Sequence, residues 1–193
     1  MGSITLKHWL LNFQASFTQF DLAPECKCSV HQGMLNAVKS VIEEVSEALL
    51  EMKEKHPDAS VAVTGHSLGG ALASLTAAIL ADRGFEPRLT TFGQPRVGDW
   101  KFVRYANSKL DYLRFVHAGD LVPTLPPTEF GYYHAGTEIW EHDGAFQICM
   151  NQGCEVPSEL GLNAEDHRWY FDQCVGTTCA YCYTKEGVQI EMS

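Results

Sequence analysis

The chain has 193 residues, of which 45% are hydrophobic and 20% charged, and its formal net charge is −10. This length and balance predict one globular domain, residues 1–193, with a sizeable core. The negative charge disfavours nucleic acid and anionic membrane surfaces as partners, whereas a neutral lipid surface stays open. No apolar run is long enough to predict a membrane-spanning helix.

The chain begins with a short amphipathic segment, residues 4–13, in which polar and apolar side chains are interleaved. Taken alone, this pattern favours a helix packed permanently on the core. The alternative is a mobile lid that exposes its apolar face to lipid. The start lacks the charged region and cleavage-site pattern of a signal peptide. Seven cysteines, five of them after residue 148, nevertheless favour an oxidising compartment.

Residues 14–31 are mixed in character and predict a loop and a short strand. From residue 32 to residue 55, apolar side chains recur at three- and four-residue spacing. This periodicity predicts one long amphipathic helix with a charged, solvated face, which ends before Pro57.

A β-prone run, residues 59–64, leads into a turn of the form G-x-S-x-G at Gly65, Ser67 and Gly69. A helix of small residues is expected to follow at 70–82. This order is typical of a nucleophile elbow, in which a strained corner exposes the Ser67 hydroxyl. The alternative is an ordinary glycine-rich turn whose serine caps the helix. The strand before the turn and the helix after it favour the elbow.

Strands and helices continue to alternate after the elbow. Residues 89–92 and 112–116 predict strands, and residues 97–108 predict the helix between them. A hairpin or edge strand is expected at 130–140, with 146–150 as its partner. The alternation predicts a mostly parallel sheet with helices on both faces.

A serine hydroxyl needs a base to accept its proton and an acid to orient that base. Functional groups of such sheets gather where the strands end. Asp120 follows the strand at 112–116, so it is the predicted acid. Asp99 and Asp111 are weaker candidates, because Asp99 suits a helix N-terminus and Asp111 precedes its strand.

Three histidines follow Asp120. Where a nucleophile elbow carries the serine, the acid and then the histidine follow it along the chain, so each of the three is a candidate base. His134 is expected to pack or form hydrogen bonds within the hairpin, and His142 stands in a polar turn. His167 comes last, where the chain closes back over the sheet, and is the predicted base. This assignment rests on order and position.

A metal site is the weaker alternative for the C-terminal cysteines. Cys179 and Cys182 form a single C-x-x-C pair without a partner pair at zinc-site spacing. We therefore predict no metal and no cofactor.

Several motifs in one order make the chain resemble the fungal class 3 lipases, which are secreted triacylglycerol lipases of the α/β-hydrolase fold. The resemblance implies Ser67 as nucleophile, Asp120 as orienting acid and His167 as base. It also implies that Ser3 and Leu68 form the oxyanion hole and that Trp9 lies in a lid, which reverses the preference for a static helix. The motifs are residues 30–34, 63–70, 92–99, 116–123, 133–136 and 167–171.

The family has an N-terminal helix and strands upstream of the residue that matches Ser3. The resemblance therefore implies an N-terminally truncated fold, with a leader and a cysteine partner upstream and secretion by analogy. The family ties its C-terminal region to that helix, so one of Cys174, Cys179 and Cys182 is expected to lack its mate. We expect Cys149 and Cys154 to pair. Cys26 and Cys28 are too close in sequence for an unstrained bond, so no pairing is expected there.

The predicted activity is hydrolysis of acylglycerols through an acyl-enzyme on Ser67, with lipid at an oil–water interface as partner. The enzyme alternatives are a feruloyl esterase or a phospholipase of the same family. The non-enzyme alternative is a truncated product without catalytic activity, which folds poorly or serves only as a binding remnant.

Overall fold

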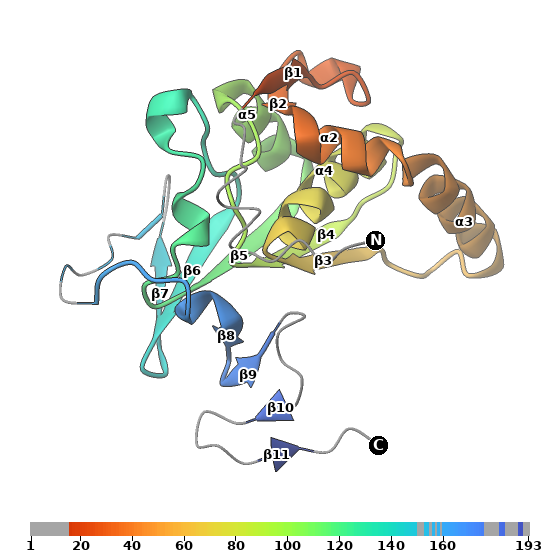
Figure 1. The fold of residues 1–193 in the computed structure, drawn as a ribbon. Helices are drawn as coiled ribbons and strands as arrows, with labels where there is room; N and C mark the ends of the chain where they lie inside the picture. The colour runs from red at the N-terminus through yellow and green to blue at the C-terminus, as the bar shows by residue number, and fades with distance from the viewer. Residues whose placement is uncertain are drawn as a thin grey trace.

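The computed structural model describes residues 16–149, 153–154, 156, 158 and 160–175, together with the backbone of 182–183 and 189–190. Its centre is a five-stranded sheet of order β3-β4-β5-β6-β7 (Figure 1). The first four strands are parallel and β7 is antiparallel to β6. The strands are β3 (Ala62–His66), β4 (Arg88–Phe92), β5 (Asp111–His117), β6 (Thr137–His142) and β7 (Ala145–Cys149).

The longer helices gather on one side of this sheet (Figure 1). Because β3, β4 and β5 are neighbours in chain order, right-handed crossovers place both connecting helices on the same face. The predicted architecture, a mostly parallel sheet with flanking helices, is confirmed, and the longer described helices lie on one face of that sheet. The helices are α2 (Gln32–Lys39), α3 (Ile42–Lys55), α4 (Leu68–Asp82) and α5 (Trp100–Lys109).

The opposite face carries a short hairpin of β8 (Trp169–Tyr170) and β9 (Gln173–Cys174). At its tip, the Phe171 ring packs against the rings of Phe92 and Phe115, with centroids 6.0 and 5.1 Å away. The remaining elements are β1 (Phe17–Gln19), β2 (Ser29–His31), β10 (Cys182–Tyr183), β11 (Gln189–Ile190) and the 3₁₀ turns η1 (Pro24–Cys26), η2 (Val122–Thr124), η3 (Thr128–Phe130) and η4 (Asp166–Arg168).

The predicted helix over 32–55 is in fact two helices, with a break at Ser40 and Val41. The Ser40 hydroxyl donates to the Ala37 carbonyl over 2.7 Å, and Val41 leaves the helical region with φ −132°. Serine side chains compete with the backbone for such hydrogen bonds. Apolar periodicity runs through the break and does not reveal it.

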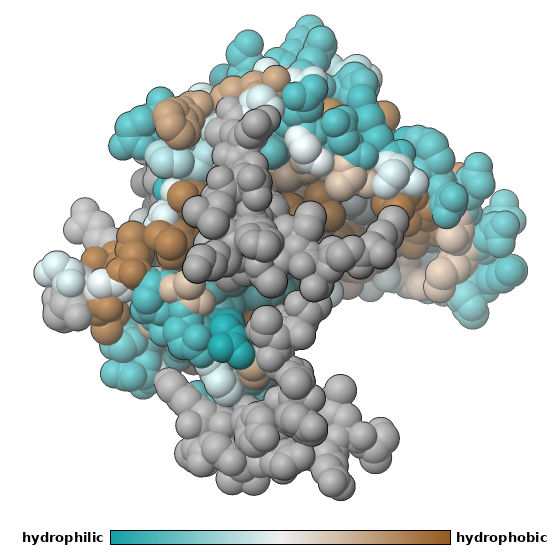
Figure 2. All heavy atoms as spheres, in the orientation of Figure 1, coloured by the Kyte–Doolittle hydropathy of each residue, from teal (hydrophilic) through white to brown (hydrophobic). Residues whose placement is uncertain are grey.

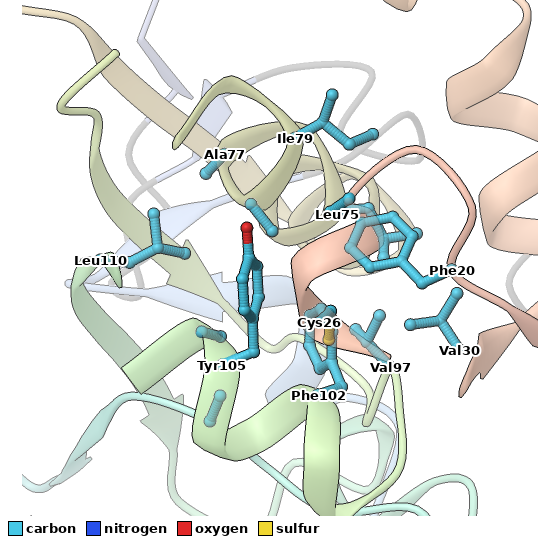
Figure 3. Close-up of a cluster of buried hydrophobic side chains, with 14 of the residues drawn as sticks. Phe20, Cys26, Val30, Leu75, Ala77, Ile79, Val97, Phe102, Tyr105 and Leu110 are labelled. Atoms are coloured by element: carbon cyan, nitrogen blue, oxygen red, sulfur yellow. The ribbon is translucent and has the colours of Figure 1, made fainter. Parts of the chain in front are cut away.

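The main core lies between α4 and the neighbouring helices α2 and α5, and Figure 3 shows part of it. Most side chains of α4 are buried, which matches its small and apolar composition. A Cβ atom on Gly70 would lie 3.3 Å from the Thr91 Cβ and 3.2 Å from the Gln94 Cβ. As the sequence predicts, Gly70 therefore lets the start of α4 lie close to the sheet.

Two disulfides join described cysteines. Cys149 pairs with Cys154, as expected. Cys26 also pairs with Cys28, so the expectation of no bond there is wrong. Lys27 lies between them in the left-handed region, with φ 49° and ψ 39°, and the two Cα atoms are 5.1 Å apart. Cys174 is disulfide-bonded as well.

Several large apolar side chains are exposed on the described surface, and some of them gather on two elements. Phe146 and Ile148 are exposed on β7, and Leu50 and Met52 are exposed on α3. Figure 2 shows the corresponding brown areas over β7 and along α3. Among the described helices, none has both the length and the apolar character needed to cross a bilayer.

Candidate active site

Ser67 stands at a strained corner between β3 and α4. Its backbone has φ 57° and ψ −130°, a conformation that non-glycine residues rarely adopt. The Ser67 N–H donates to the Phe92 carbonyl over 2.9 Å, and the Ser67 carbonyl accepts from the Gly70 N–H over 3.0 Å. A Cβ atom on Gly65 would collide with the backbone of Gly69 and Gly70. The corner therefore has the geometry of the predicted elbow.

Asp120 and His167 form a buried carboxylate–imidazole pair, with relative exposures of 1% and 2%. Asp120 lies three residues beyond the end of β5, and His167 lies in η4. The His167 Nδ1 atom is 3.0 Å from Asp120 Oδ1 and 2.8 Å from Asp120 Oδ2. A carboxylate in this position makes Nδ1 the protonated nitrogen, which leaves Nε2 free to act as the base.

The Asp120 carboxylate has two further hydrogen-bond donors. The Val122 N–H donates to Oδ1 over 2.8 Å and the Tyr170 hydroxyl to Oδ2 over 2.7 Å. Burial, followed by the nearby Asp120 charge, holds the pKa of Tyr170 well above its usual value near 10. Tyr170 therefore remains a donor at neutral pH. Tyr170 follows His167 by three residues, inside the motif 167–171, but the sequence analysis assigns it no role.

Gly93 lies against the acid–base pair at the end of β4, with φ +55°. A Cβ atom there would be 2.7 Å from Asp120 Oδ2 and 2.8 Å from His167 Nδ1. Because such approaches are closer than van der Waals contact, a larger residue would displace the pair.

His66 connects the elbow to the segment that carries His167. Its Nε2 atom is 2.8 Å from the His167 carbonyl oxygen, so Nε2 carries a proton and donates it. The centroids of the His66 and His167 rings lie 4.5 Å apart. Burial, and then the neighbouring His167, lower the pKa of His66. A neutral ring at this position adds no positive charge beside the base.

The structure brings Asp120 and His167 together but does not show a hydrogen bond from Ser67 to His167. His167 Nε2 is buried and has no hydrogen-bond partner among the described residues. This is the nitrogen that a serine nucleophile requires as its base. In free enzymes such contacts are often long and tighten on substrate binding.

The other predicted site residues fall into two groups. Leu68 is the first residue of α4, where a backbone N–H has no partner within the helix and lies at the positive end of the helix dipole. Ser3 and Trp9 lie outside the described residues, as does the predicted lid segment, residues 4–13.

The weaker candidates have other roles or positions. Asp99 caps α5 by accepting from the Phe102 N–H over 2.9 Å, as its sequence position predicts. Asp111 begins β5, at the end of the strand away from Asp120. His134 is buried, and its Nε2 donates to the Pro123 carbonyl over 2.7 Å. His142 is the last residue of β6.

One grouping of described residues has the make-up of a metal site. Glu138, Cys149 and Cys154 place potential ligand atoms within 4.8 Å of one another. The two sulfur atoms are joined in a disulfide, and Glu138 accepts from Arg114 Nη2 over 3.0 Å and from the Cys154 N–H over 2.7 Å. These potential metal ligands are therefore already engaged in a disulfide, an ion pair and a hydrogen bond.

A mostly parallel sheet, a strained serine at a strand–helix corner and a buried carboxylate–imidazole pair are features of the α/β-hydrolase fold. The chain belongs to the class 3 lipase family, because the family model described as Lipase (class 3) matches residues 1–130.

Known relatives agree with this membership. The secreted mono- and diacylglycerol lipase 1 of Fusarium solani is 39% identical over 93% of this chain and 56% of its own length. The Rhizomucor miehei lipase in complex with its propeptide has a similar fold, with a TM-score of 0.80 and 35% identity over 88% of this chain and 58% of that one. A structure titled as showing that a serine protease triad forms the catalytic centre of a triacylglycerol lipase also has a TM-score of 0.80, at 34% identity over 88% of this chain and 68% of that one. The chain spans about half the length of the curated relatives it matches.

Proposed function

We propose that the chain hydrolyses carboxylic esters, with acylglycerols as the main substrates, through an acyl-enzyme on Ser67. His167 is the general base and Asp120 orients it. The observation that carries the proposal is the buried Asp120–His167 pair, held beyond the ends of the strands that follow the strained Ser67. The structure titled for a serine protease triad in a triacylglycerol lipase supports the same assignment by similarity.

The chemistry follows from these positions. The Ser67 hydroxyl attacks the ester carbonyl while His167 Nε2 accepts its proton, and Asp120 stabilises the imidazolium that forms. The oxyanion accepts hydrogen bonds from the Leu68 N–H and from Ser3. The C–O bond to the alcohol breaks, and His167 returns the proton to the leaving oxygen. Water then attacks the acyl-enzyme by the same route, which releases the acid and regenerates Ser67.

The substrate class follows from charge and from the relatives. A net charge of −10 suits a neutral lipid surface better than an anionic one. Relatives named as secreted lipases support a secreted enzyme, acting as one domain at an oil–water interface with Trp9 in its lid. No observation favours a feruloyl esterase or a phospholipase over an acylglycerol lipase.

The test is hydrolysis of short- and long-chain glyceryl esters, below and above their solubility limits, compared with a feruloyl ester and a phospholipid. Ser67→Ala is the test variant, and the exposed Ser60→Ala is its matched control. A rate that rises when the ester phase separates, and that only Ser67→Ala abolishes, supports the proposal. A Ser67-dependent rate on the feruloyl ester or the phospholipid alone would overturn the substrate class. Folded protein without any Ser67-dependent rate would overturn the activity.

A further inference from the structure

The loop after β5, which carries Asp120, is joined to the loop that carries Asn163 by hydrogen bonds on both sides of Asp120. The Asn163 N–H donates to the Gly119 carbonyl over 2.8 Å, and the Leu121 N–H donates to the Asn163 carbonyl over 3.0 Å. Asn163 and Asp120 thus form an isolated parallel bridge outside the strands of the central sheet. A Cβ atom on Gly119 would collide with the carbonyl of Gly161, so the two backbones approach as closely as glycine allows.

The side chains of Asn163 and Asp166 extend this connection. Asp166 Oδ2 accepts from the Gly119 N–H over 2.9 Å and from Asn163 Nδ2 over 2.8 Å. Asn163 Oδ1 in turn accepts from the backbone N–H groups of Glu165 and Asp166, over 3.0 and 2.8 Å. One of these four hydrogen bonds joins the residue before Asp120 directly to the residue before His167, and the other three fix the turn at residues 163–166.

We propose that Asn163 and Asp166 are positioning residues for the candidate base, and we call this pair the 163–166 clamp. His167 and Asp120 each directly follow a residue of this network, so the clamp determines where the imidazole meets the carboxylate. It also determines the direction of Nε2, because the ring is held through Nδ1. Small misplacements of reacting groups have large effects on rate. The catalytic part of this proposal rests on the proposed function, whereas its geometric part does not.

Two nearly isosteric replacements separate position from charge. Asp166→Leu removes both bonds to Oδ2, whereas Asp166→Asn removes the charge and keeps an oxygen that can accept both. The exposed Glu165→Leu removes one adjacent negative charge and leaves the side chains of the clamp unchanged, since the Glu165 carboxylate accepts hydrogen bonds from Arg168 and Trp169 and from no other described residue. The measurement is the rate of Ser67 phosphonylation by an organophosphonate, per folded molecule, across a pH series.

We expect Asp166→Leu to lower this rate about tenfold or more, while Asp166→Asn and Glu165→Leu stay within about twofold of the parent chain. A purely structural role would lower the melting temperature and leave the rate per folded molecule unchanged, which would overturn the proposal. Equal losses in Asp166→Leu and Asp166→Asn would overturn it as well, because charge would then be the cause. If Asp166→Leu does not fold, Asn163→Ala, which leaves the bond from Gly119 to Asp166, takes its place with a smaller expected loss.

A second measurement does not depend on activity. The proton on His167 Nδ1 should give a far-downfield NMR signal, assigned by its loss in His167→Ala. We expect Asp166→Leu to broaden this signal or speed its exchange with water, and Asp166→Asn to preserve it. A parent chain that shows this pattern without Ser67 phosphonylation would refute the proposed function and support the clamp. An unchanged signal in Asp166→Leu would refute the clamp whatever the activity.

Discussion

Tyr170 and His167 donate hydrogen bonds to the same oxygen of Asp120. The Tyr170 hydroxyl lies 2.7 Å and His167 Nδ1 2.8 Å from Oδ2, while the Val122 N–H occupies Oδ1. The charge of this buried carboxylate is therefore met by three donors, as a stable buried anion requires. The phenol restricts the carboxylate to one orientation, and the carboxylate restricts the imidazole.

Tyr170→Phe should lower the rate of Ser67 phosphonylation by about tenfold, because a hydrogen bond to a charged group contributes about 1.5–3 kcal/mol. Tyr133→Phe is the matched control, since no hydrogen bond of its hydroxyl is found among the described residues. The measurement is the second-order rate constant of labelling at constant pH. Equal rate constants for the two variants would show that the phenol does not support the acid.

Gly93→Ala should both destabilise the protein and lower the labelling rate, since the new methyl group would contact Asp120 and His167. Gly144→Ala is the matched control. Gly144 also has a positive φ, +72°, but no atom lies within 4 Å of its Cβ position. Both variants carry the backbone strain of alanine at positive φ, so the excess loss in Gly93→Ala isolates the contact. Stability is compared by urea unfolding and reactivity by the labelling rate. Equal losses in Gly93→Ala and Gly144→Ala would contradict the predicted contact.

Stability should fall as the pH drops below about 6.5, the ordinary pKa of histidine. Burial lowers the pKa of His66, and burial together with Arg114 and Arg96 holds the pKa of His134 well below its ordinary value. The unfolded chain therefore binds more protons than the folded chain in this window. The stabilisation is present above about pH 6.5 and is lost as acid protonates these rings.

The measurement for this pH dependence is the urea midpoint at pH 7.5 and at pH 5.5. The midpoint should be lower at pH 5.5, and His66→Phe should reduce the difference because it removes one of the two rings. A midpoint that does not change, or that rises in acid, would contradict the assignment of these rings as neutral.

Arg114→Met should lower the free energy of unfolding by about 3–5 kcal/mol, because it leaves the buried Glu138 without its partner. Arg114 Nη2 lies 3.0 Å from Glu138 Oε2, and the two side chains are 1% and 6% exposed. The control is Arg88→Met. Its pair with Asp111 is 4.0 Å long and mostly exposed, so about 0–1 kcal/mol is expected. Similar urea midpoints for the two variants would show that the buried charge of Glu138 does not need Arg114 as its partner.

The sequence predicts the central part of the fold well, because its signals there are local. Alternating strand and helix patterns lead to β3, α4, β4, α5 and β5, and the order serine, acid, histidine selects Asp120 and His167. The pairing of Cys149 with Cys154 is confirmed, whereas the roles of Asp120 and His167 stay predictions. Each of these features depends on residues that are near in sequence or on a fixed chain order.

The features that the sequence misses depend on single backbone conformations or on tertiary contacts. The left-handed Lys27 closes the Cys26–Cys28 bond, and Ser40 divides the long helix although the apolar period continues. Among the described residues the longer helices lie on one face of the sheet, because strand order rather than periodicity determines where crossovers lie. Tyr170 is recognisable as a partner of Asp120 only after the hairpin places it there.

The central claim is that Ser67 reacts with the help of His167 and Asp120. The most direct measurement is organophosphonate labelling of the folded protein, with the modified residue located by peptide mass spectrometry. We predict a single label on Ser67 that is absent in Ser67→Ala and strongly slowed in His167→Ala. A label that persists in Ser67→Ala, or that forms at the parent rate in His167→Ala, would contradict the account.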